Sequence, residues 1–297
     1  MSDFTQLAII GPTASGKTAL AVNVARKHDA HILSLDSLSI YKEIDIVSAK
    51  PTIEERQGVK HFGIDHLYPD EPFDVKTYID LYSDVKRYCQ DENKNLVIVG
   101  GTSFYLKMLI EGVSPMPKLS YDQTKQIKQR MLSPTQVYDD MYKADPAYMK
   151  DIKKGDTYRI EKALEIYISS GIIPSVYFDT HPPKPVIEES LPVYEIVWDR
   201  SSLRERIRQR TEAMIEQGLI DEIIDLEKKY TRAPNCMKAI GIKETLMYLD
   251  GIYDKKMLIE KITINTGRLA KRQVTFNNSQ FENVVKGSLE DLKKKLL

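Results

Sequence analysis

The stretch G-P-T-A-S-G-K-T at residues 11–18 decides the fold expected for this chain. An apolar run at residues 7–10 precedes it and suits a buried strand, and a helix-like pattern follows it. A glycine-rich loop between a strand and a helix wraps its backbone N–H groups around phosphate oxygens, and the helix start adds positive dipole character. Its lysine, Lys17, reaches the outer oxygens, and the hydroxyl of Thr18 can hold Mg²⁺. The stretch therefore predicts a di- or triphosphate site with Mg²⁺ as cofactor.

The residues that end two other predicted strands help to distinguish between the classes of protein that carry such a loop. ATPases, GTPases, small-molecule kinases and some transferases share such a loop, and many that hydrolyse ATP end another core strand in a metal-binding carboxylate. Here the apolar run 96–99 leads into Gly100 and Gly101 without one, whereas Asp36 follows the strand-like run 31–35. Asp36 should face the same carboxyl edge of the sheet as the loop. This placement favours a base acting on a second substrate, although the residues alone fit a turn or helix cap equally well.

The overall composition excludes several classes of protein. Lys+Arg and Asp+Glu both total 43 in 297 residues, and this zero net charge argues against a general polyanion binder but not against a local basic face. Cys89 and Cys236 are too isolated for a disulfide framework or a zinc site. No apolar run approaches membrane-spanning length, and the first strand begins too early for a signal peptide. We therefore expect a soluble, cytoplasmic protein.

The chain divides by pattern into an α/β core and a helical insertion. Residues 1–114 alternate strand-like and helical stretches, whereas residues 115–192 are helical between proline-rich borders. Strand character returns at 193–198, and residues 193–297 are otherwise helical, mainly at 203–230, 255–275 and 287–297. The predicted fold class is α/β: a P-loop NTPase-like parallel sheet flanked by helices, with an inserted helical subdomain. A helical continuation of one domain is the alternative.

Basic residues gather in the second half of the chain. Four arginines alternate along one predicted helix, so they cannot all share a face: these are Arg204, Arg206, Arg208 and Arg210. We expect some to be solvated surface and Arg210 to be able to turn toward a phosphate. The other clusters are Arg159 with Lys162, Lys238 with Lys243, and Arg268 with Lys271 and Arg272. Each alone fits plain surface, but together they fit contact with a phosphodiester backbone.

An ordered set of motifs over most of the chain resembles the tRNA dimethylallyltransferases, the isopentenyl-tRNA transferases of bacteria. The matching segments are the loop at 11–18, Asp36-Ser37 with Tyr41 (D-S-x-Q-x-Y), Ala49-Lys50-Pro51 (A-K-P), Gly100-Gly101-Thr102 with Tyr105 (G-G-T-G-x-Y), Asp156, Arg159, Ala163, Leu164 and Glu165 (D-x-x-R-x-x-R-A-L-E), Met214, Gly218 and Leu219 (M-x-x-x-G-L), Ala239-Ile240-Gly241 with Glu244 (G-Y-x-E), and residues 270–275 (A-K-R-Q-x-T). The departures are Ser39 for Gln, Ser103 for Gly, Lys162 for Arg, and Asn277-Asn278 for an aromatic or apolar residue followed by Arg.

The resemblance implies a reaction and a set of site residues. A dimethylallyl group passes from dimethylallyl diphosphate to N6 of adenosine 37, next to the anticodon of a tRNA, and pyrophosphate leaves. The implied catalytic residues are Asp36 as the base, with Thr13, Lys17 and Arg210 on the leaving group. The implied diphosphate cradle is Gly11, Pro12, Thr13, Ala14, Ser15, Gly16, Lys17 and Thr18, with Thr18 on the metal.

The resemblance also implies the partner. The inserted helical block would grip the anticodon stem-loop, and the protein would act as a monomer. The implied tRNA-binding residues are Asp36, Ser37, Leu38, Ser39, Thr102, Tyr158, Arg159, Lys162, Lys238, Gly241, Lys243, Lys271, Arg272 and Gln273.

Two other functions compete. A P-loop kinase using ATP on a small metabolite ordinarily carries an arginine-rich lid, but the 115–192 block holds only Arg130 and Arg159. A non-catalytic RNA-binding switch driven by nucleotide would need no base at Asp36.

Overall fold

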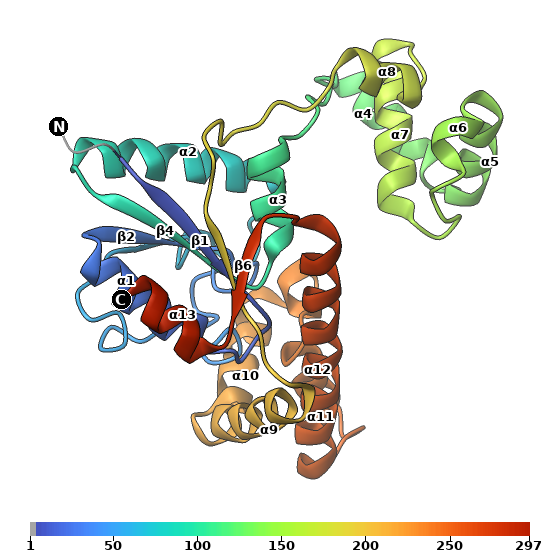
Figure 1. Ribbon diagram of the computed structural model, residues 1–297. Coiled ribbons are helices and arrows are strands. Elements are labelled where there is room, and N and C mark those ends of the chain that lie inside the picture. Colours follow the sequence, from blue (N-terminus) through green and yellow to red (C-terminus); the bar gives the residue numbers. More distant parts are fainter. Residues whose placement is uncertain (1–3) are drawn as a thin grey trace. The chain divides into compact units, whose positions relative to one another are not determined.

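The computed structural model describes residues 4–297, which form two compact units (Figure 1). The larger unit comprises the described residues up to Ile110 together with Val186–Leu297, and the smaller unit is Glu111–Pro185.

A six-stranded parallel sheet forms the centre of the larger unit, with strand order β3-β2-β4-β1-β5-β6. The strands are β1 (Gln6–Ile10), β2 (Ala30–Ser34), β3 (His61–Phe62), β4 (Asn95–Gly100), β5 (Val193–Ile196) and β6 (Val284–Gly287). Sequence patterning located the four central strands, because these are the apolar runs. It missed the edge strands β3 and β6, which are short and only partly buried.

Helices cover both faces of this sheet, as the alternation of strand side chains requires. Ala8 and Ile10 of β1 point into one core, and Ile9 points into the other. The first core includes side chains of α2 (Val75–Asp91) and α3 (Ser103–Glu111). The second is closed by α1 (Lys17–Lys27) and α13 (Leu289–Leu296), which lie side by side in Figure 1. A parallel sheet buried on both faces confirms the P-loop NTPase-like α/β class.

The remaining helices of the larger unit follow β5. They are α9 (Arg200–Glu216), α10 (Leu219–Tyr230), the 3₁₀ turn η1 (Asn235–Lys238), α11 (Ile242–Leu249) and α12 (Lys255–Gln280). The apolar pattern over 203–230 is thus shared by two helices, because Gly218 adopts a φ of 102° that breaks the first from the second. Helix α12 packs along α9, and it extends beyond the predicted 255–275.

The smaller unit is wholly helical apart from its connections. Its helices are α4 (Tyr121–Arg130), α5 (Pro134–Ala144), α6 (Pro146–Met149), α7 (Thr157–Ser170) and α8 (Pro174–Thr180). They enclose their own core around Ile127, Met141 and Leu164. The buried Asp145 carboxylate accepts the backbone N–H groups of Tyr148 (3.1 Å) and Ser175 (2.7 Å), which ties α6 to the start of α8.

The boundaries of this unit differ from the expected 115–192. The outgoing and returning chains already meet at Gly112, where an added Cβ would lie 2.0 Å from the Lys184 carbonyl oxygen, and Val113 forms an antiparallel bridge with Lys184. The N–H groups of Val186 and Ile187 both donate to Leu109 O at 2.9 Å, so the chain has rejoined the larger unit before residue 192. Proline-rich borders mark the neighbourhood of a boundary, but backbone pairing fixes its position.

Within residues 4–297, no helix is both long and apolar enough to cross a bilayer. Cys89 and Cys236 are buried free thiols.

Candidate active site

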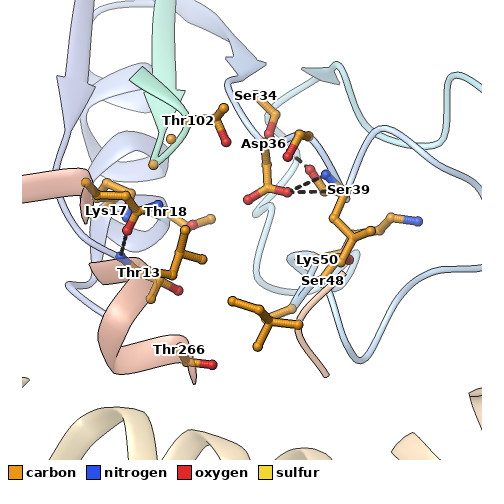
Figure 2. Close-up of a pocket in the computed structure, with 18 of the residues that line it drawn as sticks. Thr13, Lys17, Thr18, Ser34, Asp36, Ser39, Ser48, Lys50, Thr102 and Thr266 are labelled. Carbon is orange, nitrogen blue, oxygen red and sulfur yellow. Dashed lines mark hydrogen bonds between the residues drawn. The ribbon is translucent and has the colours of Figure 1, made fainter. Parts of the chain in front are cut away.

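A cavity of about 560 Å³ opens at the carboxyl edge of the sheet in the larger unit (Figure 2). The segments that follow β1, β2 and β4 contribute Thr13, Asp36 and Thr102, and α9 and α12 form further walls. In Figure 2, Thr13, Lys17 and Thr18 lie on one side of the view, and Asp36, Ser39 and Lys50 lie on the other. Parallel strands end at one edge, so residues distant in sequence meet there.

The loop at residues 11–18, called the phosphate loop below, has the backbone that its glycines allow. Gly11 has a φ of 150°, and a Cβ there would lie 2.9 Å from Ile196 O on the neighbouring strand. Gly16 caps α1 with a φ of 89°. Ala14 also takes a left-handed φ, 62°, although it has a side chain. The loop thus passes directly from β1 into the N-terminus of α1, where backbone N–H groups remain for an anion.

Two half-buried cations lie at this loop, one within it and one on α9. The Lys17 ammonium donates to Pro12 O (2.6 Å), and Arg210 of α9 donates to the Thr13 hydroxyl (3.1 Å). Burial, and secondarily the charge of Arg210, lower the pKa of Lys17 to about 7, against an opposing effect of Asp36. Burial likewise lowers the pKa of Arg210. Two cations confined beside each other, with Asp36 as the opposing charge, make this pocket suited to binding an anion.

Asp36 serves both as a turn cap and as a group directed at the cavity. Its Oδ1 accepts the backbone N–H groups of Leu38 (2.8 Å) and Ser39 (3.0 Å). Neither hydrogen bond uses Oδ2, and Asp36 lines the cavity. The two interpretations left open by the sequence are therefore compatible, because one carboxylate oxygen fixes the side chain and the other is left for a ligand.

The segment around Asp36, residues 36–51 and called the Asp36 loop below, is held by two long side chains. The Lys50 ammonium binds Tyr41 O (2.6 Å), Asp45 (2.7 Å) and Asp65 (2.6 Å), with its side chain 4% exposed. The carboxylate of Glu222, in the first turn of α10, accepts the N–H groups of residues 45, 46 and 47 at 2.9, 2.7 and 3.0 Å. Sequence reasoning did not single out Glu222 or give Lys50 a role.

The residues predicted to bind tRNA fall into three groups. The first lines the same cavity: Asp36, Ser37, Leu38, Ser39, Thr102, Gly241, Arg272 and Gln273. The second is exposed on η1, α11 and α12 outside the cavity lining: Lys238, Lys243 and Lys271. The third is on α7 of the smaller unit, where Arg159 pairs with Asp156 and Lys162 pairs with Glu165 (2.7 Å) near the exposed Tyr158.

Gln273 occupies an unexpected place. Its Oε1 accepts the backbone N–H of Thr13 (2.9 Å), and a Cβ on Gly101 would lie 2.5 Å from its Nε2. The resemblance assigned Gln273 to the tRNA. In the structure, this side chain extends from α12 and binds the phosphate loop. The Thr13 N–H is therefore already paired with a side chain of α12.

The structure also accommodates the departures from the resembled motifs. Ser39 is buried, and its hydroxyl lies 3.2 Å from that of Ser34. Buried Asn277 donates to the buried carboxylate of Glu195 in β5 (2.8 Å), which Lys286 of β6 also approaches (3.4 Å). The polar residue in α12 is thus paired with a polar residue in the sheet through one hydrogen bond, while Asn277 Oδ1 and Glu195 Oε2 are buried without a hydrogen-bond partner among the described residues.

An apolar wall completes the cavity, and the sequence analysis did not assign it. It consists of side chains from α9 and α12, which approach because these helices pack together: Ile207, Met214, Ile262, Leu269 and Phe276. In sequence these residues look like ordinary core positions, so no local signal distinguishes them.

The metal predicted at Thr18 has few protein ligands. Among residues 4–297, no three His, Cys, Asp or Glu side chains cluster in a way that could hold a metal ion. Thr18 lines the cavity beside Lys17. A single hydroxyl could serve Mg²⁺ only where the ion takes most of its ligands from the phosphates of the substrate and from water.

Comparison with known proteins agrees with this geometry. The model of the IPP transferase family matches residues 39–280. The tRNA dimethylallyltransferase of Sulfurovum sp. (strain NBC37-1) is 62% identical over 98% of this chain and 97% of its own length. That of Sulfurimonas denitrificans is 53% identical over 97% of both chains. The crystal structure of full-length tRNA isopentenylpyrophosphate transferase from Bacillus halodurans superposes with a TM-score of 0.70 at 29% identity, covering 98% of this chain and 94% of the other. The chain therefore belongs to the IPP transferase family.

Proposed function

We propose that this protein transfers a dimethylallyl group from dimethylallyl diphosphate to N6 of adenosine 37 in tRNA and releases pyrophosphate. One observation carries the proposal beyond family membership: a cavity with the half-buried cations Lys17 and Arg210 at one side and the Asp36 carboxylate at the other. A diphosphate needs the cations, and an amine nucleophile needs a proton acceptor. The relatives named above are tRNA dimethylallyltransferases, which favours this activity over a small-metabolite kinase.

The phosphate loop would hold the leaving group. As the bond between the allylic carbon and the bridging oxygen breaks, negative charge grows on the diphosphate, and Lys17, Arg210 and the Thr13 hydroxyl are placed to stabilise it. Lys17 has a pKa of about 7 without ligand, and an anion beside it would favour its charged form. Bound Mg²⁺ would supply further charge neutralisation, with Thr18 as its protein ligand.

Asp36 would act on the acceptor. The adenine must leave its stack, because N6 of a stacked base cannot point at the allylic carbon. Asp36 Oδ2 would accept the N6–H hydrogen bond and take the proton as the N6–C bond forms, while pyrophosphate departs. The hydrogen bonds from Leu38 and Ser39 to Oδ1 hold the carboxylate in place for that step.

The apolar wall from α9 and α12 offers a place for the five-carbon chain between these two ends. The basic residues Lys238, Lys243 and Lys271, and those of α7 in the smaller unit, would contact the tRNA backbone around the anticodon stem-loop. All of these groups come from one chain, so a monomer is sufficient. We also propose a cytoplasmic location for the reaction, in keeping with a tRNA substrate.

A ligand competition tests the proposal against its main rival. Purified protein is incubated with Mg²⁺ and an anticodon stem-loop carrying adenosine 37, with either dimethylallyl diphosphate or ATP. We expect stoichiometric pyrophosphate release and an N6-dimethylallyl nucleoside with the first compound only. Preferential ATP binding, or turnover of ATP without prenylation, would contradict the proposal and support a kinase.

A further inference from the structure

The outer side of the phosphate loop, which faces away from the cavity, is held by two side chains with no role so far. The indole N–H of Trp198 donates to Ser15 O (3.0 Å), and Nε of Arg206 donates to Ala14 O (2.8 Å). The Arg206 guanidinium lies 4.6 Å from the centroid of the Trp198 ring. The two side chains therefore support each other while each binds one of two consecutive loop carbonyls.

These contacts rest on a built interface. Leu203 and Ile207 of α9 are buried against Ala270 of α12, and Ala14 and Trp198 pack on that cluster. Arg206 and Arg210 are one helical turn apart and hence on the same side of α9. Arg210 binds the hydroxyl of Thr13, whereas Arg206 binds the backbone carbonyl of Ala14, the next residue of the loop.

The backbone of Ala14 explains what this support does. Its φ of 62° lies in the left-handed region, which costs a residue with a Cβ about 1 kcal/mol or more. A hydrogen bond from a charged donor to the Ala14 carbonyl favours that conformation and offsets the cost. With the carbonyls of Ala14 and Ser15 held outward, the loop keeps its curvature around an anion.

We infer that Arg206 and Trp198 are positioning residues that hold the phosphate loop in its ligand-ready shape. They act through the carbonyls of Ala14 and Ser15 and do not touch the ligand. This inference deepens the proposed function and rests on it, because it takes the ligand of the loop to be a diphosphate.

Calorimetric titration with inorganic pyrophosphate and Mg²⁺ measures the effect. We expect Arg206→Gln to weaken pyrophosphate binding about tenfold, which corresponds to loss of one charge-assisted hydrogen bond. Arg206→Lys should recover part of this loss, and Trp198→Phe, which keeps a ring under Arg206 but loses the N–H, should weaken binding about threefold. Arg208→Gln is the matched control, because Arg208 lies on the same helix and pairs with Glu205 and Glu212 instead.

A second measurement separates positioning from general weakening. Ala14→Gly accepts a positive φ without strain, so Arg206→Gln should cost only about threefold or less in that background. In steady state, Arg206→Gln should raise KM for dimethylallyl diphosphate while kcat and KM for tRNA stay within about twofold. Thermal unfolding run in parallel checks that each variant is folded.

Several outcomes would overturn the inference. Wild-type affinity in Arg206→Gln, an equal loss in Arg208→Gln, or an undiminished loss in the Ala14→Gly background would each do so while the proposed function stands. A wild-type protein that binds no pyrophosphate would overturn the proposed function and the inference together.

Discussion

The phosphate loop and the Asp36 loop both follow a central parallel strand, yet they are held in opposite ways. The phosphate loop passes at once into α1 and points N–H groups and cations at the cavity, and side chains from α9 and α12 grip its backbone. The Asp36 loop continues into irregular chain and presents a carboxylate. Lys50 and Glu222 bind this loop at positions away from Asp36. Both loops therefore depend on helices that are distant in sequence: the phosphate loop, on the proposed donor side, is held by α9 and α12, and the Asp36 loop, on the proposed acceptor side, is held by α10.

The largest expected effect is on the acceptor side, from Asp36→Asn. The amide oxygen can still accept the N–H groups of Leu38 and Ser39, so the loop keeps its shape, but the group can no longer take a proton. We expect kcat for tRNA prenylation to fall by about 10²–10⁴, with pyrophosphate binding retained.

The matched variant is Asp36→Ala, which removes cap and base together. It should lose the same turnover and, in addition, about 1 kcal/mol of unfolding free energy. Turnover near that of the wild type in a tRNA prenylation assay of either variant would remove Asp36 from the mechanism.

The next effect is on the donor side and depends on pH. Burial lowers the pKa of Lys17 to about 7, so the free protein loses this charge as the pH rises through that value. A bound diphosphate restores the charged form, and binding therefore takes up a proton above pH 7. Pyrophosphate affinity should fall by up to about tenfold for each pH unit above 7.

Calorimetry in buffers of different ionisation enthalpy measures that proton uptake. Lys17→Met serves as the control, since it keeps the titration of the ligand and removes that of the lysine. If Lys17→Met showed the same pH profile and proton uptake as the wild type, another group would be responsible.

The smallest expected effect comes from Glu222→Gln, which tests whether the two loops are supported independently. Glu222→Gln leaves one acceptor oxygen for the three N–H groups of residues 45–47 and turns an NH₂ toward them. We expect KM for tRNA to rise about three- to tenfold, from the loss of one or two hydrogen bonds, with pyrophosphate affinity unchanged.

Asp225→Asn is the control for that variant, because Asp225 is exposed on the same helix and pairs only with Lys228 among the contacts described. If Glu222→Gln weakened pyrophosphate binding as much as it raised KM for tRNA, the two sides of the cavity would not be supported independently.

Sequence reasoning succeeded where function is carried by contiguous residues. The phosphate loop is one stretch between a strand and a helix, so its place in the fold and the need for its glycines could be predicted directly, while the role of Lys17 stays a prediction. Asp36 could be placed because it ends a strand of the same sheet. The edge strands, the break at Gly218 and the limits of the smaller unit were less accessible, because they depend on pairing and on backbone angles that composition does not reveal.

The same reasoning failed where one face of a helix had to be chosen. The alternating arginines of α9 gave no way to assign Arg206 to a loop carbonyl, and no pattern indicated that Gln273, whose tRNA contact stays a prediction, also binds the phosphate loop. Only the packing of α9 against α12 decides which side chains reach the phosphate loop.

The sequence by itself therefore determined the α/β class and predicted a phosphate site with an opposing carboxylate, because each is encoded within a few adjacent residues. Tertiary structure alone decided how that site is closed, braced and lined with apolar side chains. Those features join residues as far apart as Thr13 and Gln273, and only packing of the helices brings such residues within hydrogen-bonding distance.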